Sequence, residues 1–482
     1  MRYMRRMRPA FNPALSVVLA AILVGCASVP ASPEATSPPA DGNFLSDEAG
    51  LPLNTRWWTQ FGDPDLTNLV DLALSANKSL DVAAANLRAA EASAAGARLE
   101  ESYSTSTSVS GEVGRAARSG QDVSVSAQGG LGASWEFDAF GRIEAQIAAA
   151  EFDVEAARQA RRDIAVIVAS QTALNYVQMR GAQTRLEVAR KNAQTQAEGL
   201  DLLNTLFENG RATRLDLERA EAQYRTTLAS LPRYEAAIQS ARNALAALTG
   251  QAASDPDSLL VELVSAGSEI PEHDGPIMAG SVSELVRRRP DIREAEAAIG
   301  RQLALGEAAR AQLFPTVTLN ANLLAVFDDS NDVGDLSSFG FGIGPSINWA
   351  GPDLRRVRAN IAVADAVSEA AIAQYEQTVL NALSEVESAL TDYTNELRRR
   401  DDLERAAASA RRAIDLARLR FEEGLDDYLD VLEAQRTLLA AEDQLAESRL
   451  QSSNLAITAY RALGGVEFLN GDPQAAPGIA LE

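Results

Sequence analysis

The stretch DLLNTLFENGRATRLD at residues 201–216 has a counterpart, DLARLRFEEGLDDYLD, at residues 415–430. The match extends without a gap over residues 135–220 and 349–434, at an offset of 214 residues. This period is much longer than the roughly 20–50 residues of solenoid repeats. The chain is therefore interpreted as two copies of one large unit, and we expect each half to form half of a pseudo-symmetric object.

Each copy contains a very long segment with the composition of an uninterrupted helix. Residues 142–207 hold no Pro and only two Gly, Gly181 and Gly199, while residues 354–421 hold neither. At 1.5 Å per residue, each segment would form a helix about 100 Å long. Such length without internal breaks is typical of coiled-coil-like assemblies rather than of ordinary globular helices.

Shorter helices are expected around the two long ones. An Asn-Gly turn and a Glu-Gly turn end the long segments, and return helices are predicted at 215–248 and 428–463. Pro232 is expected to kink or break the first return helix. Two further helices, at about 65–99 and at 290–312, are predicted near the start of each copy.

Between the short and the long helix of each copy lies a segment with the pattern of a β-hairpin. Residues 103–137 and 315–349 are rich in Ser, Thr, Val, Asn and Gly, with period-two alternation. Strands of about ten residues can cross a bilayer, but four strands cannot close, and an open edge facing lipid is excluded. We therefore expect oligomerisation, three copies giving twelve strands; a soluble β-sandwich is the alternative.

The predicted fold is mainly α with a small β part. It is a long α-helical coiled-coil barrel that continues into a transmembrane β-barrel completed by trimerisation, with four strands from each chain.

The N-terminus has the features of an export signal. Four Arg residues precede the apolar run at 14–24, and Leu-Val-Gly then leads to Cys26, the only Cys in the chain. This junction resembles the lipobox of bacterial lipoproteins, in which the Cys becomes the lipidated first residue; the alternative is an ordinary signal followed by a chance Cys. The next residue, Ala27, is not the Asp that tends to retain lipoproteins at the inner membrane. We expect a protein anchored by lipid to the outer membrane.

Composition excludes several classes of function. A net charge of −23 argues against nucleic acid or anionic lipid as a partner. The sequence has no phosphate-cradling loop, no G-x-S-x-G and no H-E-x-x-H motif. Its one His, His273, makes no convincing zinc site without Cys. We expect no catalytic residues, no cofactor and no metal, and hence no enzyme.

The domain organisation follows from these segments. We expect a signal peptide at 1–25, a lipidated flexible tether at 26–48, a first repeat at 49–250, a linker at 251–280, a second repeat at 281–465 and a C-terminal tail at 466–482.

Four motifs, taken together, resemble one family over nearly the whole chain. They are WWTQFGDP at 57–64, WEFDAFGR at 135–142, ALTG at 247–250 and RPDIR at 289–293. In this order they are similar to the outer-membrane efflux lipoproteins of the TolC/OprM type, in the NodT-like branch of the outer-membrane factors of RND efflux pumps.

The resemblance implies a homotrimer in the outer membrane, with a tube of helices crossing the periplasm. The end of this tube would dock on a periplasmic adaptor protein and, through it, on an inner-membrane RND-type pump. The chain would then be a passive exit duct for small molecules. A similar duct for protein secretion is the first alternative; a lipid-anchored coiled-coil structural or adaptor protein without a pore is the second.

The turns that join each long helix to its return helix are the candidate docking tips. Their glycines are expected to take positive φ to reverse the chain, and in the family these turns resemble the adaptor-contacting grooves. The candidate docking residues are Gly210, Arg211, Leu215, Asp216, Gly424, Leu425 and Leu429.

The second tip is acidic, with Asp426, Asp427, Asp430 and Glu433. Positions 430 and 433 share a helix face. By resemblance to the family they would face the pore at its periplasmic constriction, where threefold symmetry would make rings of carboxylates that set charge selectivity. A solvated acidic helix end is the alternative. The family's closing latch uses a Tyr and a basic residue where this chain has Phe421 and Asp426, so we do not expect that latch.

Overall fold

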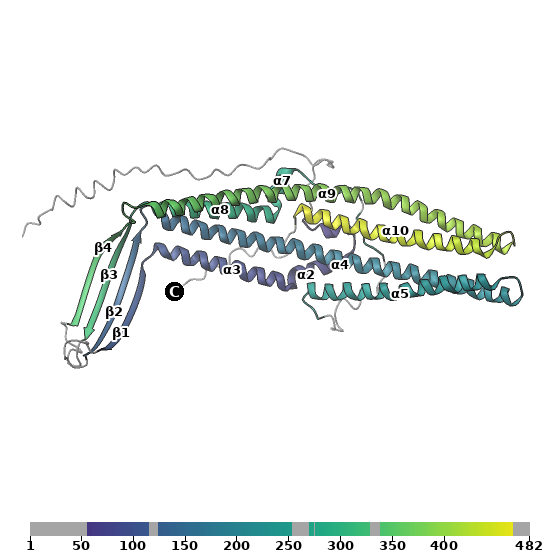
Figure 1. The fold of residues 1–482 in the computed structure, drawn as a ribbon, viewed down its shortest axis with the longest axis horizontal. Helices are drawn as coiled ribbons and strands as arrows, with labels where there is room; N and C mark the ends of the chain where they lie inside the picture. The colour runs from purple at the N-terminus through teal and green to yellow at the C-terminus, as the bar shows by residue number, and fades with distance from the viewer. Residues whose placement is uncertain (1–54, 115–123, 253–268, 274, 328–337, 466–482) are drawn as a thin grey trace, which may run out of the picture.

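The computed structural model describes residues 55–114, 124–252, 269–273, 275–327 and 338–465. The predicted signal peptide, the tether with Cys26, and the C-terminal tail lie outside the described residues. The described chain is an elongated bundle of helices with a β-sheet at one end (Figure 1).

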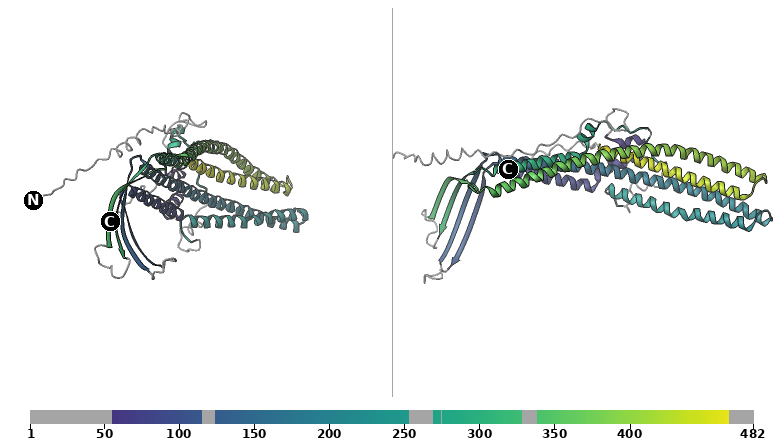
Figure 2. Two further views of the ribbon diagram at one scale, coloured as in Figure 1. Left: turned by 60° about the vertical axis from the view of Figure 1, so that its left-hand side comes forward. Right: turned by 45° about the horizontal axis from the view of Figure 1, so that its top comes forward.

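Two long helices run the length of the bundle. Helix α4 spans Arg142–Glu208 and α9 spans Arg355–Glu422, against 142–207 and 354–421 expected from the sequence. Each reverses into a return helix, α5 at Arg214–Leu248 and α10 at Tyr428–Leu463, and the two hairpins lie side by side (Figures 1 and 2). Many of the buried positions are Ala, which lets the helix backbones approach closely.

Shorter helices complete each long helix at the end nearer the sheet. Helices α2 at Pro64–Ala76 and α3 at Lys78–Arg98 run along α4, and α8 at Pro290–Ala311 packs between α4 and α9 (Figure 1). A short helix, α7 at Val282–Arg288, precedes α8.

The single helix expected at about 65–99 is wrong, because the chain breaks at Asn77. This residue has φ −67° and ψ 129°, and its side chain accepts a hydrogen bond from the Ser79 amide at 2.8 Å. Its Nδ2 also donates to the Leu248 carbonyl at 2.8 Å. Asn77 therefore bonds the junction of α2 and α3 to the C-terminal end of α5. Helices α3 and α5 both pack on α4, one after the other along its length.

In the second repeat, Arg289 makes the equivalent junction. Its guanidinium donates to the Ala462 carbonyl at 2.6 Å and to the carboxylates of Asp291 and Glu385. The start of α8 thus meets the end of α10, and the RPD motif has a structural role at this junction.

The expected break at Pro232 does not occur. Helix α5 runs through this residue, which lies on its exposed face. Pro232 leaves the carbonyl four residues earlier without its amide donor, and a single missing bond does not end a helix of this length.

The sheet has four antiparallel strands in the order β1-β2-β3-β4. Strands β1 (Ser104–Gly114) and β2 (Ser124–Phe137) come from the first repeat, and β3 (Thr316–Phe327) and β4 (Phe339–Asn348) from the second. The two hairpins join through β2 and β3, with Trp135 opposite Leu319. Figure 2 shows the sheet as a curved strip with β1 and β4 at its edges.

Equivalent tryptophans fix the sheet to the helices. Trp135 Nε1 donates to the Glu101 carbonyl at 3.1 Å, and Trp349 Nε1 donates to the Leu313 carbonyl at 2.9 Å. These residues are one repeat apart, and each bond ties the last turn of a short helical segment to the end of a strand.

The main core lies midway along the bundle. The helix η1 at Trp57–Phe61 places both tryptophans in this core, and the Trp57 ring stacks on Tyr460 at a centroid distance of 5.4 Å. The WWTQF motif therefore attaches the start of the first repeat to α10 of the second. Over the residues that the structure describes, no helix combines the length and apolar character needed to cross a membrane.

Candidate functional site at the helical tips

Both hairpins turn on a glycine with positive φ, as predicted. Gly210 has φ 71° and Gly424 has φ 72°. After each glycine the next amide bonds back to the helix: Arg211 donates to the Leu206 carbonyl at 2.8 Å, and Leu425 donates to the Arg420 carbonyl at 2.9 Å. The two tips thus have the same backbone turn, and their chemistry differs only through side chains.

At the first tip, the polar side chains are engaged within the turn. Thr213 and Asp216 form a capping box: the Thr213 amide donates to Asp216 Oδ2 at 3.1 Å, and the Asp216 amide donates to Thr213 Oγ1 at 3.2 Å. Arg214 pairs with Glu218 one turn further on. Asp216 therefore stabilises the first turn of α5, while Arg211 is exposed at the turn.

At the second tip, the four predicted acidic residues separate into two kinds. Arg420 donates through Nη2 to Asp426 Oδ1 at 2.8 Å, and its guanidinium holds the pKa of the Asp426 carboxyl below its usual value. Asp427, Asp430 and Glu433 are exposed and make no ion pair with any residue of the described ranges. We call these three residues the acidic face of this tip, whereas Asp426 belongs to the turn.

Exposed leucines surround both turns. Leu215 is 56% exposed at the first tip, and Leu425 and Leu429 are 67% and 43% exposed at the second. Exposed apolar side chains grouped at one end of a protein are typical of a contact surface for a partner. The structure brings the predicted docking residues of each turn together, and the two groups lie at the same end of the bundle (Figure 1).

The opposite end of the molecule exposes apolar side chains on the sheet. Phe341 is 88% exposed and Ile343 is 73% exposed, and Val109, Leu131 and Leu323 are also exposed. An apolar sheet surface of this kind requires cover by lipid or by protein.

Sequence reasoning missed the role of His273, which it considered only as a zinc ligand and set aside. The side chain is 6% exposed. Its Nδ1 lies 3.0 Å from the Tyr393 hydroxyl and its Nε2 lies 2.8 Å from the Tyr460 hydroxyl. It therefore fastens the linker to α9 and α10. Its partners are 120 and 187 residues away, so no local signal could have found them.

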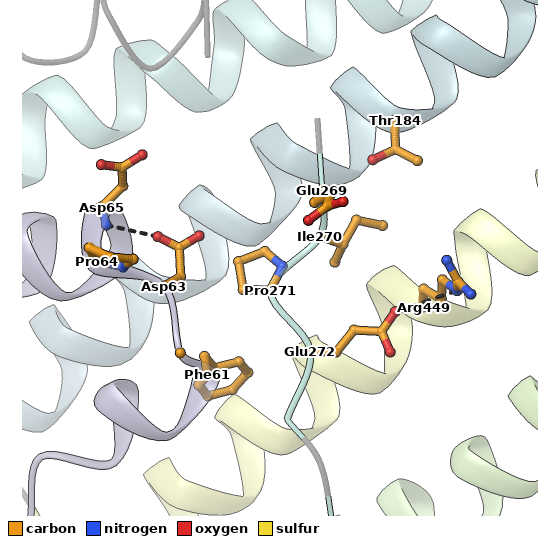
Figure 3. A pocket seen from close by; sticks show the side chains of 11 residues that line it. Phe61, Asp63, Pro64, Asp65, Thr184, Glu269, Ile270, Pro271, Glu272 and Arg449 are labelled. Atoms are coloured by element: carbon orange, nitrogen blue, oxygen red, sulfur yellow. Dashed lines mark hydrogen bonds and ion pairs between the residues drawn. The ribbon is translucent and has the colours of Figure 1, made fainter. Parts of the chain in front are cut away.

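A surface pocket of about 660 Å³ lies beside this linker (Figure 3). Four of its eleven lining residues are acidic, and one of them, Asp63, also caps α2 by accepting the Asp65 amide at 2.8 Å. Among the described residues, no group of three or more His, Cys, Asp or Glu side chains is placed to hold a metal ion. The contacts of Asp63 and Glu272 in this lining are structural: Asp63 caps α2, and Glu272 pairs with Arg400 of α9.

Comparison with known proteins shows similarity over almost the full chain. The profile of the family described as outer membrane efflux protein matches residues 69–251 and 281–465. Nodulation protein T of Rhizobium leguminosarum bv. trifolii is 30% identical, over 96% of this chain and 98% of its own. The pyoverdine export outer membrane protein OpmQ of Pseudomonas aeruginosa is 31% identical, over 94% and 96%. The solved structure of the outer-membrane channel OprN matches with a TM-score of 0.81 at 33% identity, covering 90% of this chain and 99% of that one.

Proposed function

This chain belongs to the outer membrane efflux protein family, and we propose that it is the exit duct of a tripartite efflux pump in the outer membrane. It conducts small molecules passively from the periplasm to the outside. The observation that carries this function is the match of both repeats to the family. It is supported by an export protein and an outer-membrane channel that this chain matches over nearly their whole length. These relatives are channel and export proteins, not enzymes.

The duct is a trimer. What supports this is the sheet, which has four strands and two open edges at β1 and β4. Three copies joined edge to edge would give a twelve-stranded barrel, and closure would pair the backbone groups that an open edge leaves facing lipid. Apolar residues such as Val363 and Leu380 are exposed on α9 and would be covered by neighbouring copies.

The partners are a periplasmic adaptor at the tips and, beyond it, an inner-membrane pump of the RND type. The support for the adaptor site is the set of exposed leucines held by two rigid glycine turns. Arg211 on one tip and the acidic face on the other would distinguish the two docking positions by charge.

Asp427, Asp430 and Glu433 form the selectivity site at the periplasmic opening. In a trimer, each would become a ring of three carboxylates, which attracts cations and repels anions. The support is that these three residues are exposed and lie on or beside the first turns of α10. Asp426 contributes less, because Arg420 compensates its charge.

Cys26 carries the lipid that anchors the mature chain in the outer membrane. This residue lies outside the described part of the chain, and the support is its position after the apolar signal segment.

Deletion of the gene in its own host tests the function. We expect deletion to raise the accumulation of small cationic dyes such as ethidium, and the wild-type gene to restore the low level. Unchanged dye accumulation together with loss of a secreted protein would overturn the efflux role in favour of protein secretion.

A further inference from the structure

Helix α4 contains two glycines among its 67 residues, Gly181 and Gly199. Each glycine in a helix interior costs about 1 kcal/mol relative to Ala, so its presence calls for a packing reason. The two are eighteen residues apart, which is five helical turns, so they lie on one face of α4.

Both glycines contact α10 of the second repeat. A Cβ at Gly181 would approach Leu450 Cδ2 to 2.8 Å. A Cβ at Gly199 would overlap the hydroxyl of Tyr428, while the ring carbon Cζ behind it stays at 3.7 Å. The contact between α4 and α10 thus has a large side chain of α10 seated on a glycine of α4 at each end.

Polar contacts lie between these two seats. Arg185 Nε donates to Asp443 Oδ1 at 2.8 Å, and Asn192 Nδ2 donates to Glu442 Oε2 at 3.4 Å. Nearer the tips, the two hairpins meet through an apolar cluster of Leu203, Ala220, Ile414, Tyr428, Val431 and Leu432. The outermost contact between the hairpins therefore depends on apolar packing.

Tyr428 is the centre of this outer contact. It is the first residue of α10, it is 7% exposed, and its ring lies 5.2 Å from that of Phe421 in an edge-to-face arrangement. Within the described ranges its hydroxyl makes no hydrogen bond. The hydroxyl can therefore be removed without leaving a polar partner unsatisfied.

The seat exists once in the chain and is not repeated. At the offset of 214 residues, Gly199 corresponds to Ala413 and Tyr428 corresponds to Arg214. The contact is therefore specific to the pairing of α4 with α10, and it does not follow from the shared plan of the two repeats.

We propose that Tyr428 seated on Gly199 is the clasp that holds the two hairpins of one chain together at the tip, and so limits the opening of the duct. This inference rests on the proposed function. When the clasp releases, the hairpin of α9 and α10 moves away from α4, carrying Asp430 and Glu433 with it, while the Arg185 contacts hold the hairpins at their inner end.

The test is a pair of substitutions: the first displaces the Tyr428 side chain from Gly199, and the second restores its fit. Gly199→Ala places a methyl group where the hydroxyl lies, and we expect it to displace Tyr428 and raise the conductance of the trimer in planar bilayers several-fold. Tyr428→Phe alone should change little. The double variant, Gly199→Ala with Tyr428→Phe, should return to the wild-type conductance, because the remaining ring carbon is at an ordinary contact distance.

Two glycine substitutions serve as controls. Gly181→Ala makes the same change on the same helix face, but at the end held by the main core, and should leave the conductance unchanged. Gly96→Ala, in α3, adds a methyl group where nothing lies within 4 Å, and controls for helix propensity.

A distance measurement separates the clasp from the duct. Spin labels are placed at Asn209→Cys and Glu423→Cys on a Cys26→Ser background, and labelled chains are diluted among unlabelled ones. The distance between the two labels should be longer in Gly199→Ala than in the wild type, and should return to the wild-type value in the double variant. An unchanged distance in Gly199→Ala, or a double variant that stays wide, would overturn the clasp. If the distances change as expected in both variants but no variant conducts current, the result would support the clasp and contradict the duct.

A second variant covers the case in which Gly199→Ala does not fold. Tyr428→Ala removes the ring without adding atoms, and should widen the same distance; if the tip keeps its wild-type separation, the clasp is wrong.

Discussion

Arg420 and Asp426 pair across the turn of the second tip, whereas Asp430, four residues further on, is exposed on the first turn of α10. The pair joins the last turn of α9 to the loop that follows it. Of the four predicted carboxylates, Asp426 is thus paired within the turn, whereas the other three are exposed, and we propose that their charge acts on passing ions.

Neutralising the exposed carboxylates should therefore lower charge selectivity. For Asp430→Asn with Glu433→Gln, we expect the ratio of cation to anion permeability to fall several-fold, because each substitution removes three charges from the trimer. Reversal potentials in asymmetric KCl measure this ratio. Asp401→Asn, an exposed site in α9 away from the tip, is the control, and equal ratios in both variants would contradict the assignment.

Asp426→Asn should affect the turn in a pH-dependent way. Because Arg420 lowers the pKa of Asp426 in the folded protein, the pair stabilises the turn above the unfolded pKa, and this contribution is lost as the pH falls through the folded pKa. Amide hydrogen exchange at residues 420–427 should be faster in the variant than in the wild type at neutral pH. The difference should shrink in strong acid; a difference that grows with acidity would contradict this role.

Charged substitutions at the exposed leucines should prevent docking. We expect Leu425→Asp and Leu429→Asp to abolish copurification with the periplasmic adaptor of the host, since the apolar contact is lost and a charge is desolvated. The melting temperature should change little, because both side chains are exposed. Val82→Asp, at an exposed site in α3, should bind normally, and retained binding in both tip variants would refute the docking surface.

Replacing His273 should destabilise the protein. In His273→Leu the hydroxyls of Tyr393 and Tyr460 each lose one partner but keep another, the Gly275 carbonyl for Tyr393 and Gln60 Oε1 for Tyr460. We therefore expect a loss of about 0.5–1.5 kcal/mol for each hydrogen bond removed. Denaturant unfolding of the detergent-solubilised protein measures the loss. A His273→Leu variant as stable as the wild type would show that these bonds contribute nothing.

The lipid anchor can be tested by mass. We expect the mature wild-type chain to carry the added mass of a lipidated N-terminal Cys, and Cys26→Ser to lack it. Intact-mass spectrometry of both proteins decides this, and an unmodified thiol at Cys26 in the wild type would refute the anchor.

Much of this fold could be predicted from the sequence, because the strongest signals in the sequence act over a few residues. The absence of Pro from residues 142–207 and the glycine at each tip act within a few residues, and the observed bounds of α4 and α9 differ from the expected ones by one residue. The missed break at Asn77 is also local, but it carries no Pro or Gly, and the Leu248 carbonyl that accepts from its side chain is 171 residues away.

The features that sequence reasoning could not reach depend on how the folded chain brings side chains together. The surroundings of His273 and the seat of Tyr428 on Gly199 join residues far apart in the chain. The pairing of Asp426 with Arg420 depends on how the turn aims two side chains six residues apart. Spacing placed Asp430 and Glu433 on one helix face, but only the folded tip distinguished them from Asp426.

The central claim is that three chains form one open path through the outer membrane, and conductance of the purified full-length mature protein in a planar bilayer tests it most directly. We predict discrete, cation-selective currents from the trimeric fraction. A folded protein that gives no current, in the wild type and in the widened Gly199→Ala variant alike, would contradict the account.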